Sequence, residues 1–179
     1  YHSYISSATV ILNSYNGEEP FVHFLKKQFA ANKKFGSRDR KVISSLCYCY
    51  FRTIHLFNEE AIEQKIIKGL FLCESKSNPL LEELYPDLNE KINWKSEEKL
   101  QFLHFWLELL FPFSTHLSIE INQDEFITSF LRQPLLYLRI RPGKHQSVIS
   151  KLKEASLLFD MKDEECIALE NATSLDKIL

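Results

Sequence analysis

Hydrophobic residues recur every three or four positions through most of the chain, the period that buries one face of an α-helix. Residues that end or begin helices interrupt the pattern, as Asn16-Gly17, Pro20 and Ser37 do. We therefore expect a series of helices in the first 133 residues. Their predicted ranges are 3–15, a second helix beginning near Pro20, 38–57, 59–73, 79–84, 97–111 and 124–132.

Two of these helices carry specific expectations. Ser37 is predicted to be the N-cap of the helix over 38–57. The buried face of that helix is expected to comprise Val42, Ile43, Leu46, Cys49, Tyr50, Ile54 and Phe57. The helix that Ser96 caps is hydrophobic nearly all round until Pro112, which predicts that it lies buried between other helices.

The pattern changes near residue 134. Residues 135–141 are typical of a strand, Pro142-Gly143 of a turn, 146–155 of a helix, and 157–160 and 166–169 of two short strands. This β-α-β unit has too few strands for a sheet, so we expect the chain to stop inside a second domain. The predicted fold is mainly α, with a helical bundle over 1–133 followed by a small, incomplete α/β subdomain over 134–179.

Composition agrees with a globular helical chain. Hydrophobic residues make up 45% and charged residues 26% of the 179 residues, and only four Gly and six Pro occur. No run approaches the ~18 apolar residues that a membrane span needs, and the start of the chain does not resemble a secretory signal. We expect a cytoplasmic protein that has no membrane partner.

Charge is distributed unevenly along the chain. The net charge is −2, but residues 26–52 hold eight basic residues against the single acid Asp39, a net +7 that leaves −9 on the other 152 residues. The basic residues are Lys26, Lys27, Lys33, Lys34, Arg38, Arg40, Lys41 and Arg52. Such an asymmetry indicates an anionic partner rather than a particular fold.

The sequence offers no supported catalytic or metal centre. The four glycines are isolated, so no phosphate-binding glycine loop exists, and no two histidines have the i, i+4 spacing of a helical metal site. Cys47 and Cys49 would point about 200° apart on a helix. We interpret the four cysteines as buried, reduced thiols, and we expect no enzymatic activity from these residues. They are Cys47, Cys49, Cys73 and Cys166.

One helix face combines cations with an aromatic residue and contains no acid. Its members follow one another at steps of three and four; they are Arg38, Lys41, Ser45, Tyr48, Arg52 and His55. Lysine and arginine neutralise phosphates, and an aromatic side chain can stack on an unpaired base. The face therefore predicts RNA contact, although a solvated helix face is the alternative. For Asp39 and Arg40 the alternative is a structural role, in which they cap the helix or form pairs at its start.

Two runs of sequence resemble a known family. The run from Phe35 to Arg40, continuing through Leu46-Cys47-Tyr48 to Phe51-Arg52, is similar to the N-terminal region of the Fmu/Sun-type RNA cytosine-5 methyltransferases, which has a NusB-like fold. The run from Gln133 to Arg141, followed by Lys144, resembles the family's P-x-x-x-L-R-V-N-x-x-K entry into a small α/β subdomain. Residues 171–179 resemble the stretch before the catalytic domain. One position departs from the pattern, since Arg141 stands where the family has Asn.

The resemblance implies a NusB-like RNA-binding domain, ribosomal RNA as the partner and a downstream catalytic domain of the same protein. It also implies S-adenosylmethionine as the methyl donor of the whole enzyme, with two catalytic cysteines, one of which attacks cytosine C6. Neither cysteine motif occurs in these 179 residues, so no catalytic residue or cofactor is assigned to them. DNA is not expected as a partner.

The predicted RNA-binding residues come from both parts of the chain. They are Lys33, Lys34, Arg38, Arg40, Lys41, Tyr48, Arg52, Arg139 and Lys144. Two alternatives stay open. A helical protein-interaction scaffold would suit a basic partner because most of the chain is acidic. A free-standing NusB-like antitermination factor is the other, although an all-helical factor would not need the strand-forming tail.

Overall fold

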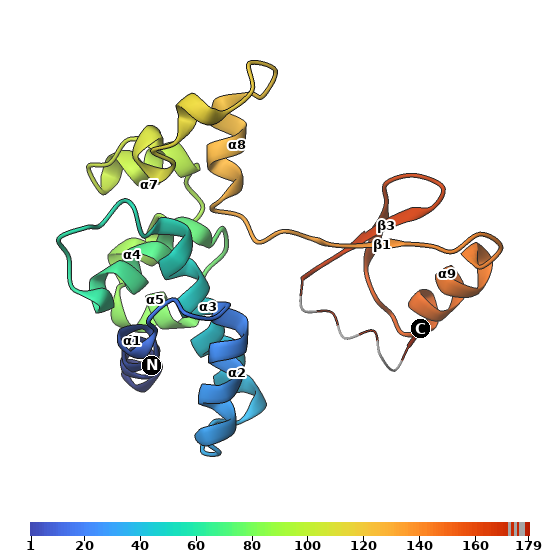
Figure 1. Cartoon of the computed structure of the whole chain (residues 1–179), viewed down its shortest axis with the longest axis horizontal. Helices are drawn as coiled ribbons and strands as arrows, with labels where there is room; N and C mark the ends of the chain where they lie inside the picture. The colour runs from blue at the N-terminus through green and yellow to red at the C-terminus, as the bar shows by residue number, and fades with distance from the viewer. Residues whose placement is uncertain (172, 174, 176–177) are drawn as a thin grey trace. The chain divides into compact units, whose positions relative to one another are not determined.

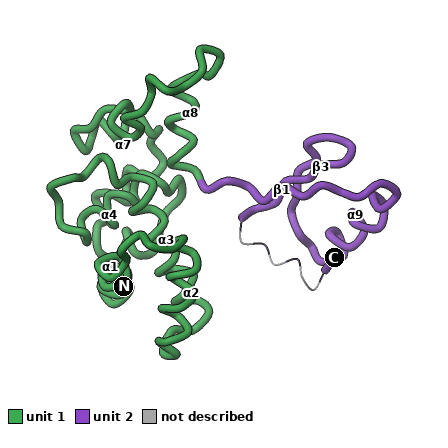
Figure 2. Tube along the Cα trace, in the orientation of Figure 1, with its two compact units in different colours: residues 1–132 green, residues 133–179 purple. Residues whose placement is uncertain are grey.

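The computed structural model describes residues 1–171, 173, 175 and 178–179. The chain divides into two compact units, unit 1 (Tyr1–Arg132) and unit 2 (Gln133–Leu179) (Figures 1 and 2). Helices dominate the described residues, and the strands are confined to unit 2. The expectation of a mainly helical chain is confirmed.

Unit 1 is entirely helical in its regular structure. Its α-helices are α1 (His2–Ser14), α2 (Phe21–Ala31), α3 (Ser37–Thr53), α4 (Ile62–Cys73), α5 (Pro79–Leu84), α6 (Pro86–Glu90), α7 (Ser96–Phe102) and α8 (Gln123–Ser129). Two short 3-10 helices, η1 (Leu107–Leu110) and η2 (Ser114–His116), lie between α7 and α8. Among the described residues, none of the helices has both the length and the apolar character needed to cross a lipid bilayer.

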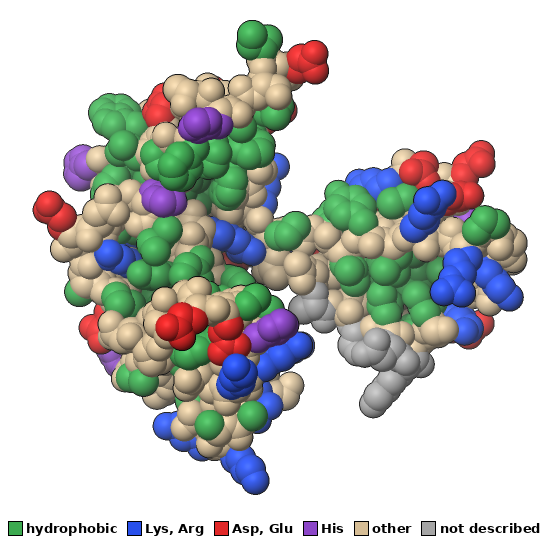
Figure 3. Space-filling view, viewed as in Figure 1, with side chains coloured by type: hydrophobic (Ala, Val, Ile, Leu, Met, Phe, Trp, Pro, Cys, Tyr) green, Lys and Arg blue, Asp and Glu red, His purple; other side chains and the backbone are tan. Residues whose placement is uncertain are grey.

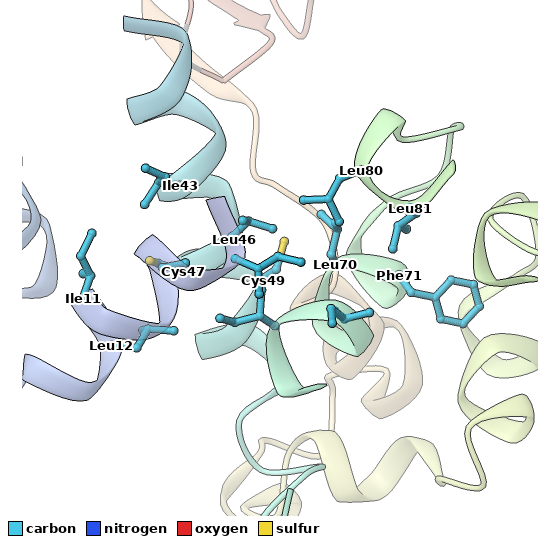
Figure 4. Packing of buried hydrophobic residues seen from close by; sticks show 14 of the residues in the cluster. Ile11, Leu12, Ile43, Leu46, Cys47, Cys49, Leu70, Phe71, Leu80 and Leu81 are labelled. Atoms are coloured by element: carbon cyan, nitrogen blue, oxygen red, sulfur yellow. The ribbon is translucent and has the colours of Figure 1, made fainter. Parts of the chain in front are cut away.

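Helix α3 is the centre of unit 1, because both α1 and α4 pack along it. The main core gathers buried side chains from α1 to α5 around Ile43, Leu46 and Cys47 of α3 (Figure 4). Cys47 is fully buried although the predicted buried face omitted it. Gly69 of α4 faces the backbone of α3, which lets the two helices approach closely.

Helix α3 ends four residues earlier than the sequence predicted. The buried hydroxyl of Thr53 donates to the carbonyl of Cys49 at 3.0 Å, and the backbone turns over Ile54–Leu56 with Leu56 N donating to Thr53 O. A Thr side chain that bonds back to the preceding turn weakens the helix at that point. Leu56 and Phe57 consequently enter a second core instead of extending the α3 face.

The predicted long helix after Ser96 is wrong. Helix α7 stops at Phe102, and His104 follows in the left-handed region with φ 62°. His104 N donates to Gln101 O and Phe105 N to Leu100 O, both at 2.9 Å, the pair of bonds that closes a helix in a Schellman motif. Leu100 and Leu110 are buried in the second core, whereas the Trp106 side chain is 67% exposed, so this segment is not buried all round.

The described residues of unit 2 form a small three-stranded sheet, which corrects the expectation of too few strands. The elements are β1 (Leu136–Arg139), α9 (His145–Glu154), β2 (Phe159–Met161) and β3 (Cys166–Leu169). The strand order is β1-β3-β2, and β3 runs antiparallel to both neighbours. Strands β1 and β2 are therefore parallel to each other with β3 between them, so α9 connects a split β-α-β unit. Leu152 of α9 is fully buried against Ile140, Ile167 and Leu169.

Candidate nucleic-acid interface

The start of α3 is built around the carboxylate of Asp39. One oxygen accepts a hydrogen bond from Gly36 N at 2.8 Å and the other accepts one from the Tyr4 hydroxyl at 2.8 Å. Both bonds stabilise the ionised form, so the pKa of Asp39 is lowered, chiefly by Tyr4, and the pKa of Tyr4 is raised. Asp39 thus caps the helix, while Ser37 is its first residue and not the predicted N-cap. The same carboxylate ties α1 to α3.

Four cations surround this helix start, and we call them the cationic surface: Lys33, Lys34, Arg38 and Lys41. All four are exposed, and none forms an ion pair within the part of the chain that the structure describes. In the face drawn in Figure 3, Lys and Arg side chains gather around α2 of unit 1. These four cations therefore lie in water outside any of the ion pairs of the described residues, and Lys34 also lies over the Phe35 ring at 5.1 Å from the centroid.

Two other basic residues of the segment, Lys27 and Arg40, have partners, whereas Lys26 is exposed and forms no ion pair within the described residues. Lys27 pairs with Glu19 at 2.8 Å. Arg40 Nε donates to the carbonyl of Phe35 at 2.9 Å, and its guanidinium lies over the Phe29 ring at 5.8 Å from the centroid. Arg40 thus holds the loop before α3 in place. This is the structural role that the sequence allowed as the alternative to RNA contact.

A cavity of about 580 Å³ lies beside the cationic surface, between α1, α3, α4 and the start of α5. Its lining residues are Tyr1, Ser3, Tyr4, Arg38, Lys41, Val42, Ser45, Leu46, Leu70, Asn78, Pro79 and Leu80. Arg38, Lys41 and Ser45 were predicted to share one helix face, and all three line this cavity. The tyrosines of α1 were missed, because only the packing of α1 on α3 brings them here.

The second half of the predicted helix face is engaged elsewhere. The Tyr48 side chain is 38% exposed, and its ring packs edge-on against Phe21 at 5.7 Å. His55 lies beyond the end of α3, which removes it from the predicted helix face, and its ring packs against Phe113 at 6.0 Å. Within this half of the predicted face, Tyr48 is the aromatic side chain on α3 that remains partly exposed to solvent.

Arg52 is half-buried beside Cys73, the last residue of α4, and Glu74, the residue that follows it. Interaction with the Cys73 thiol raises the pKa of Cys49, and burial adds to that rise, while interaction with Cys49 lowers the pKa of Cys73. Arg52 lowers the pKa of Cys73 further. Its charge is thus directed toward a thiol pair and a carboxylate, unlike the cationic surface.

All four cysteines carry free thiols, as interpreted from the sequence. Cys47 and Cys49 are buried, and burial raises the pKa of Cys47 to about 12. Cys73 and Cys166 are half-buried, so the expectation of full burial is wrong for them. Within the described ranges, no group of three or more His, Cys, Asp or Glu side chains is arranged to hold a metal ion.

Unit 2 brings the remaining predicted cations together. Arg139 forms an ion pair with Glu165 at 3.1 Å, and Lys144 is exposed just before α9. Both line a cavity of about 570 Å³ that also receives Arg141 and Lys151, and none of the described lining residues has an acidic side chain. Lys151 Nζ donates to the carbonyl of Leu179 at 3.4 Å. Arg141 and Lys151 were not predicted as RNA-binding residues. Arg141 stands where the family pattern has Asn, and Lys151 belongs to a helix face whose neighbours the sequence does not reveal.

Comparison with known proteins identifies no relative. No protein-family model matches the chain, no curated protein matches it, and no solved structure matches it. The resemblance to the Fmu/Sun-type methyltransferases therefore depends on the sequence runs alone. Part of one run, residues 172, 174 and 176–177, lies outside the described residues.

Proposed function

We propose that unit 1 binds RNA through the cationic surface. The observation that carries the proposal is that Lys33, Lys34, Arg38 and Lys41 are all exposed and free of carboxylate partners among the described residues. When unpaired surface cations bind phosphates, they displace the counterions that the nucleic acid holds. The release of these counterions supplies most of the affinity for nucleic acid. A merely solvated helix face would mix acids with bases, and the nearby acid, Asp39, is occupied by Gly36 and Tyr4.

Structured RNA with unpaired bases is the nucleic acid that fits best. Proteins read such RNA by stacking splayed bases on aromatic side chains next to basic groups. Tyr48 keeps 38% of its side chain exposed on the helix that carries Arg38 and Lys41, and its edge contact with Phe21 holds the ring in place. This arrangement suits single-stranded loops better than a uniform duplex.

The sequence resemblance extends the proposal to ribosomal RNA. In that case these residues hold the RNA while a domain that binds S-adenosylmethionine methylates a cytosine, and this chain's residues take no part in methyl transfer. The cations that line the cavity of unit 2, including Arg141 and Lys144, would add phosphate contacts.

The test is the salt dependence of RNA binding. We expect the triple variant Lys34→Glu, Arg38→Glu, Lys41→Glu to bind a labelled RNA stem-loop at least tenfold more weakly at 100 mM salt, with a flatter plot of log affinity against log salt. Each lost phosphate contact lowers that slope by about 0.7 for single strands. Fluorescence anisotropy between 50 and 200 mM salt measures both quantities.

A matched control separates local contacts from net charge. Lys76, Lys95 and Arg132 are exposed residues of unit 1 outside the cationic surface and its cavity, and reversing all three changes the net charge by the same amount. Equal weakening by the two triple variants would mean that RNA responds only to overall charge. Unchanged affinity in the first variant would reject the proposal.

A protein-interaction scaffold is the second candidate, favoured by apolar side chains exposed between residues 94 and 130 of unit 1. They include Trp94, Phe102, Trp106, Leu109, Phe113, Ile119, Ile121 and Phe130. Clusters of exposed apolar groups often mark protein contacts. A partner that remains bound after nuclease treatment, and is lost in Trp106→Ser, would favour this function. A free-standing antitermination factor fits less well, because it does not account for the sheet of unit 2.

A further inference from the structure

The cavity beside the cationic surface is lined by aromatic and by aliphatic side chains. Tyr1 and Tyr4 are the aromatic members, with ring centroids 6.2 Å apart, and the bond of the Tyr4 hydroxyl to Asp39 at 2.8 Å fixes the position of its ring. Val42 and Leu46 of α3 and Leu80 of α5 belong to the aliphatic lining. A flat ligand with apolar faces can pack against both kinds of lining, and we call the aliphatic members the aliphatic wall.

The polar groups of the cavity suit a ligand that is also an anion. Arg38 and Lys41, one helical turn apart on α3, both line it, and no acidic side chain is among its lining residues. Ser45 is half-buried in the lining, and its hydroxyl makes no hydrogen bond to any side chain or backbone group that the structure describes. It is therefore available to donate to, or accept from, the polar edge of a ligand.

We infer that this cavity holds one unpaired nucleotide of the bound RNA. The base lies between the Tyr4 ring and the aliphatic wall, its polar edge faces Ser45, and the flanking phosphates contact Arg38 and Lys41. A volume of about 580 Å³ lies within the ~300–1,000 Å³ of small-molecule sites, so a whole nucleotide fits. The inference rests on the proposed function, since it names the part of the RNA that unit 1 recognises.

The first test fills the cavity without changing its charge. Ser45→Trp places an indole where the base would lie, whereas Ser6→Trp adds the same side chain on the exposed face of α1, outside the lining. We expect Ser45→Trp to weaken binding of a single-stranded RNA about tenfold, the loss of one stacked base, and to leave a fully paired duplex within about twofold. Ser6→Trp should change neither. Ser45→Leu, a smaller filling residue, repeats the test if the tryptophan variant fails to fold by circular dichroism.

The second test uses the unmodified chain. Single-stranded RNA carrying 5-iodouridine is irradiated in the complex, and the cross-linked peptide is identified by mass spectrometry. We expect a cross-link to Tyr4, which lines the cavity, and its loss when unlabelled single-stranded RNA competes but not when duplex competes. Cross-links confined to residues outside the lining would overturn the inference.

The outcomes distinguish the two proposals. If the wild-type chain binds neither single-stranded nor duplex RNA, the proposed function fails and the inference fails with it. If the triple charge reversal weakens binding while Ser45→Trp or Ser45→Leu leaves single-stranded binding unchanged, the cationic surface stands and the nucleotide cavity is rejected.

Discussion

Lys99 is a charged residue that unit 1 buries, with only 2% of its surface exposed. Its ammonium donates to the carbonyls of Phe71 and Glu74, and it lies over the Phe71 ring at 5.0 Å from the centroid. These carbonyls belong to the last turn of α4 and to the residue after it, where carbonyl groups have no hydrogen-bond donor within the helix. A cation there also meets the negative end of the helix dipole. Lys99 therefore closes the C-terminus of α4 from a distant part of the chain.

Replacing Lys99 by methionine should lower the free energy of unfolding by about 1–3 kcal/mol, because buried carbonyls lose their donor while the aliphatic stem is kept. Urea denaturation followed by circular dichroism measures the change. Lys95→Met serves as the control, because Lys95 is exposed and lies just before α7, the helix that contains Lys99. Its free energy of unfolding should fall within about 0.5 kcal/mol of wild type. A stability equal to or above wild type in Lys99→Met would show that burying the charge costs more than its bonds return.

The same burial makes stability depend on pH. Desolvation lowers the pKa of Lys99 to about 8 from 10.5. Between these two pH values the unfolded chain binds more protons than the folded chain, so the free energy of unfolding gains a contribution that rises with pH. Below about pH 8 both states are protonated and this contribution is constant. We expect the difference in free energy of unfolding between wild type and Lys99→Met to widen from pH 8 to 10. Urea denaturation midpoints at each pH measure this difference. A difference that narrows or stays constant would contradict the lowered pKa of buried Lys99.

At the scale of elements, the contact between α3 and α4 depends on Gly69. A Cβ atom there would lie 2.7 Å from the Thr53 hydroxyl and 2.9 Å from the carbonyl oxygen of Cys49. The backbone carbonyl cannot move without shifting α3. Alanine ordinarily favours a helix over glycine by about 1 kcal/mol, yet overpacking a core costs about 1–3 kcal/mol. We expect the clash to dominate, so that Gly69→Ala lowers the thermal midpoint and the free energy of unfolding.

Gly36→Ala is the matched control for that substitution. Its Cβ would meet only the Asp39 carboxylate, at an ordinary 3.4 Å, and its φ of −70° is open to any residue. Differential scanning calorimetry should place Gly69→Ala several degrees below wild type and below Gly36→Ala, which loses only the preference of an N-cap for glycine over alanine. Equal midpoints for the two variants would mean that α3 and α4 can separate without cost.

The sequence predicted those elements whose ends are determined locally. Asn78 caps α5 by accepting from Leu80 N, and Pro79 occupies the first turn, so the predicted range 79–84 is correct. The predicted range 166–169 also matches β3. The end of the helix after Ser96 could not be predicted, because a left-handed His104 ends it and histidine signals that conformation far more weakly than glycine does. Helix α6 was missed for a related reason, since Tyr85-Pro86 was interpreted only as the end of a helix.

The candidate site was predictable where charge alone determines it. Lys33, Lys34, Arg38 and Lys41 are exposed, as a segment with eight basic residues and one acid implied. The roles of Arg40 and Arg52 depend on Phe35 O and on Cys73, partners that only the folded chain provides. Tyr4 joins the site because Asp39, thirty-five residues later, holds it there. Tertiary contacts therefore decide which cations stay available, and sequence periodicity does not.

At the scale of the whole molecule, each unit has its own apolar core. Unit 1 has two buried clusters, one around α3 and one that joins Phe57, Leu100 and Ile127, while the core of unit 2 is formed by Ile140, Leu152, Ile167 and Leu169. A group of elements that buries its own core can fold by itself. The cationic surface and its neighbouring cavity lie wholly within unit 1.

Residues 1–132 produced alone should therefore fold and bind RNA. We expect their helical circular dichroism and a cooperative thermal transition to persist, because no residue of either core cluster of unit 1 lies beyond Leu131. Affinity for single-stranded RNA should fall, and its salt slope should decrease by about 2 if Arg141, Lys144 and Lys151 each contact one phosphate. The full chain with these three residues changed to glutamate should lose at least as much of the slope. If instead residues 1–132 fold but retain the full slope, the cations of unit 2 do not touch the RNA, and unit 1 alone accounts for binding.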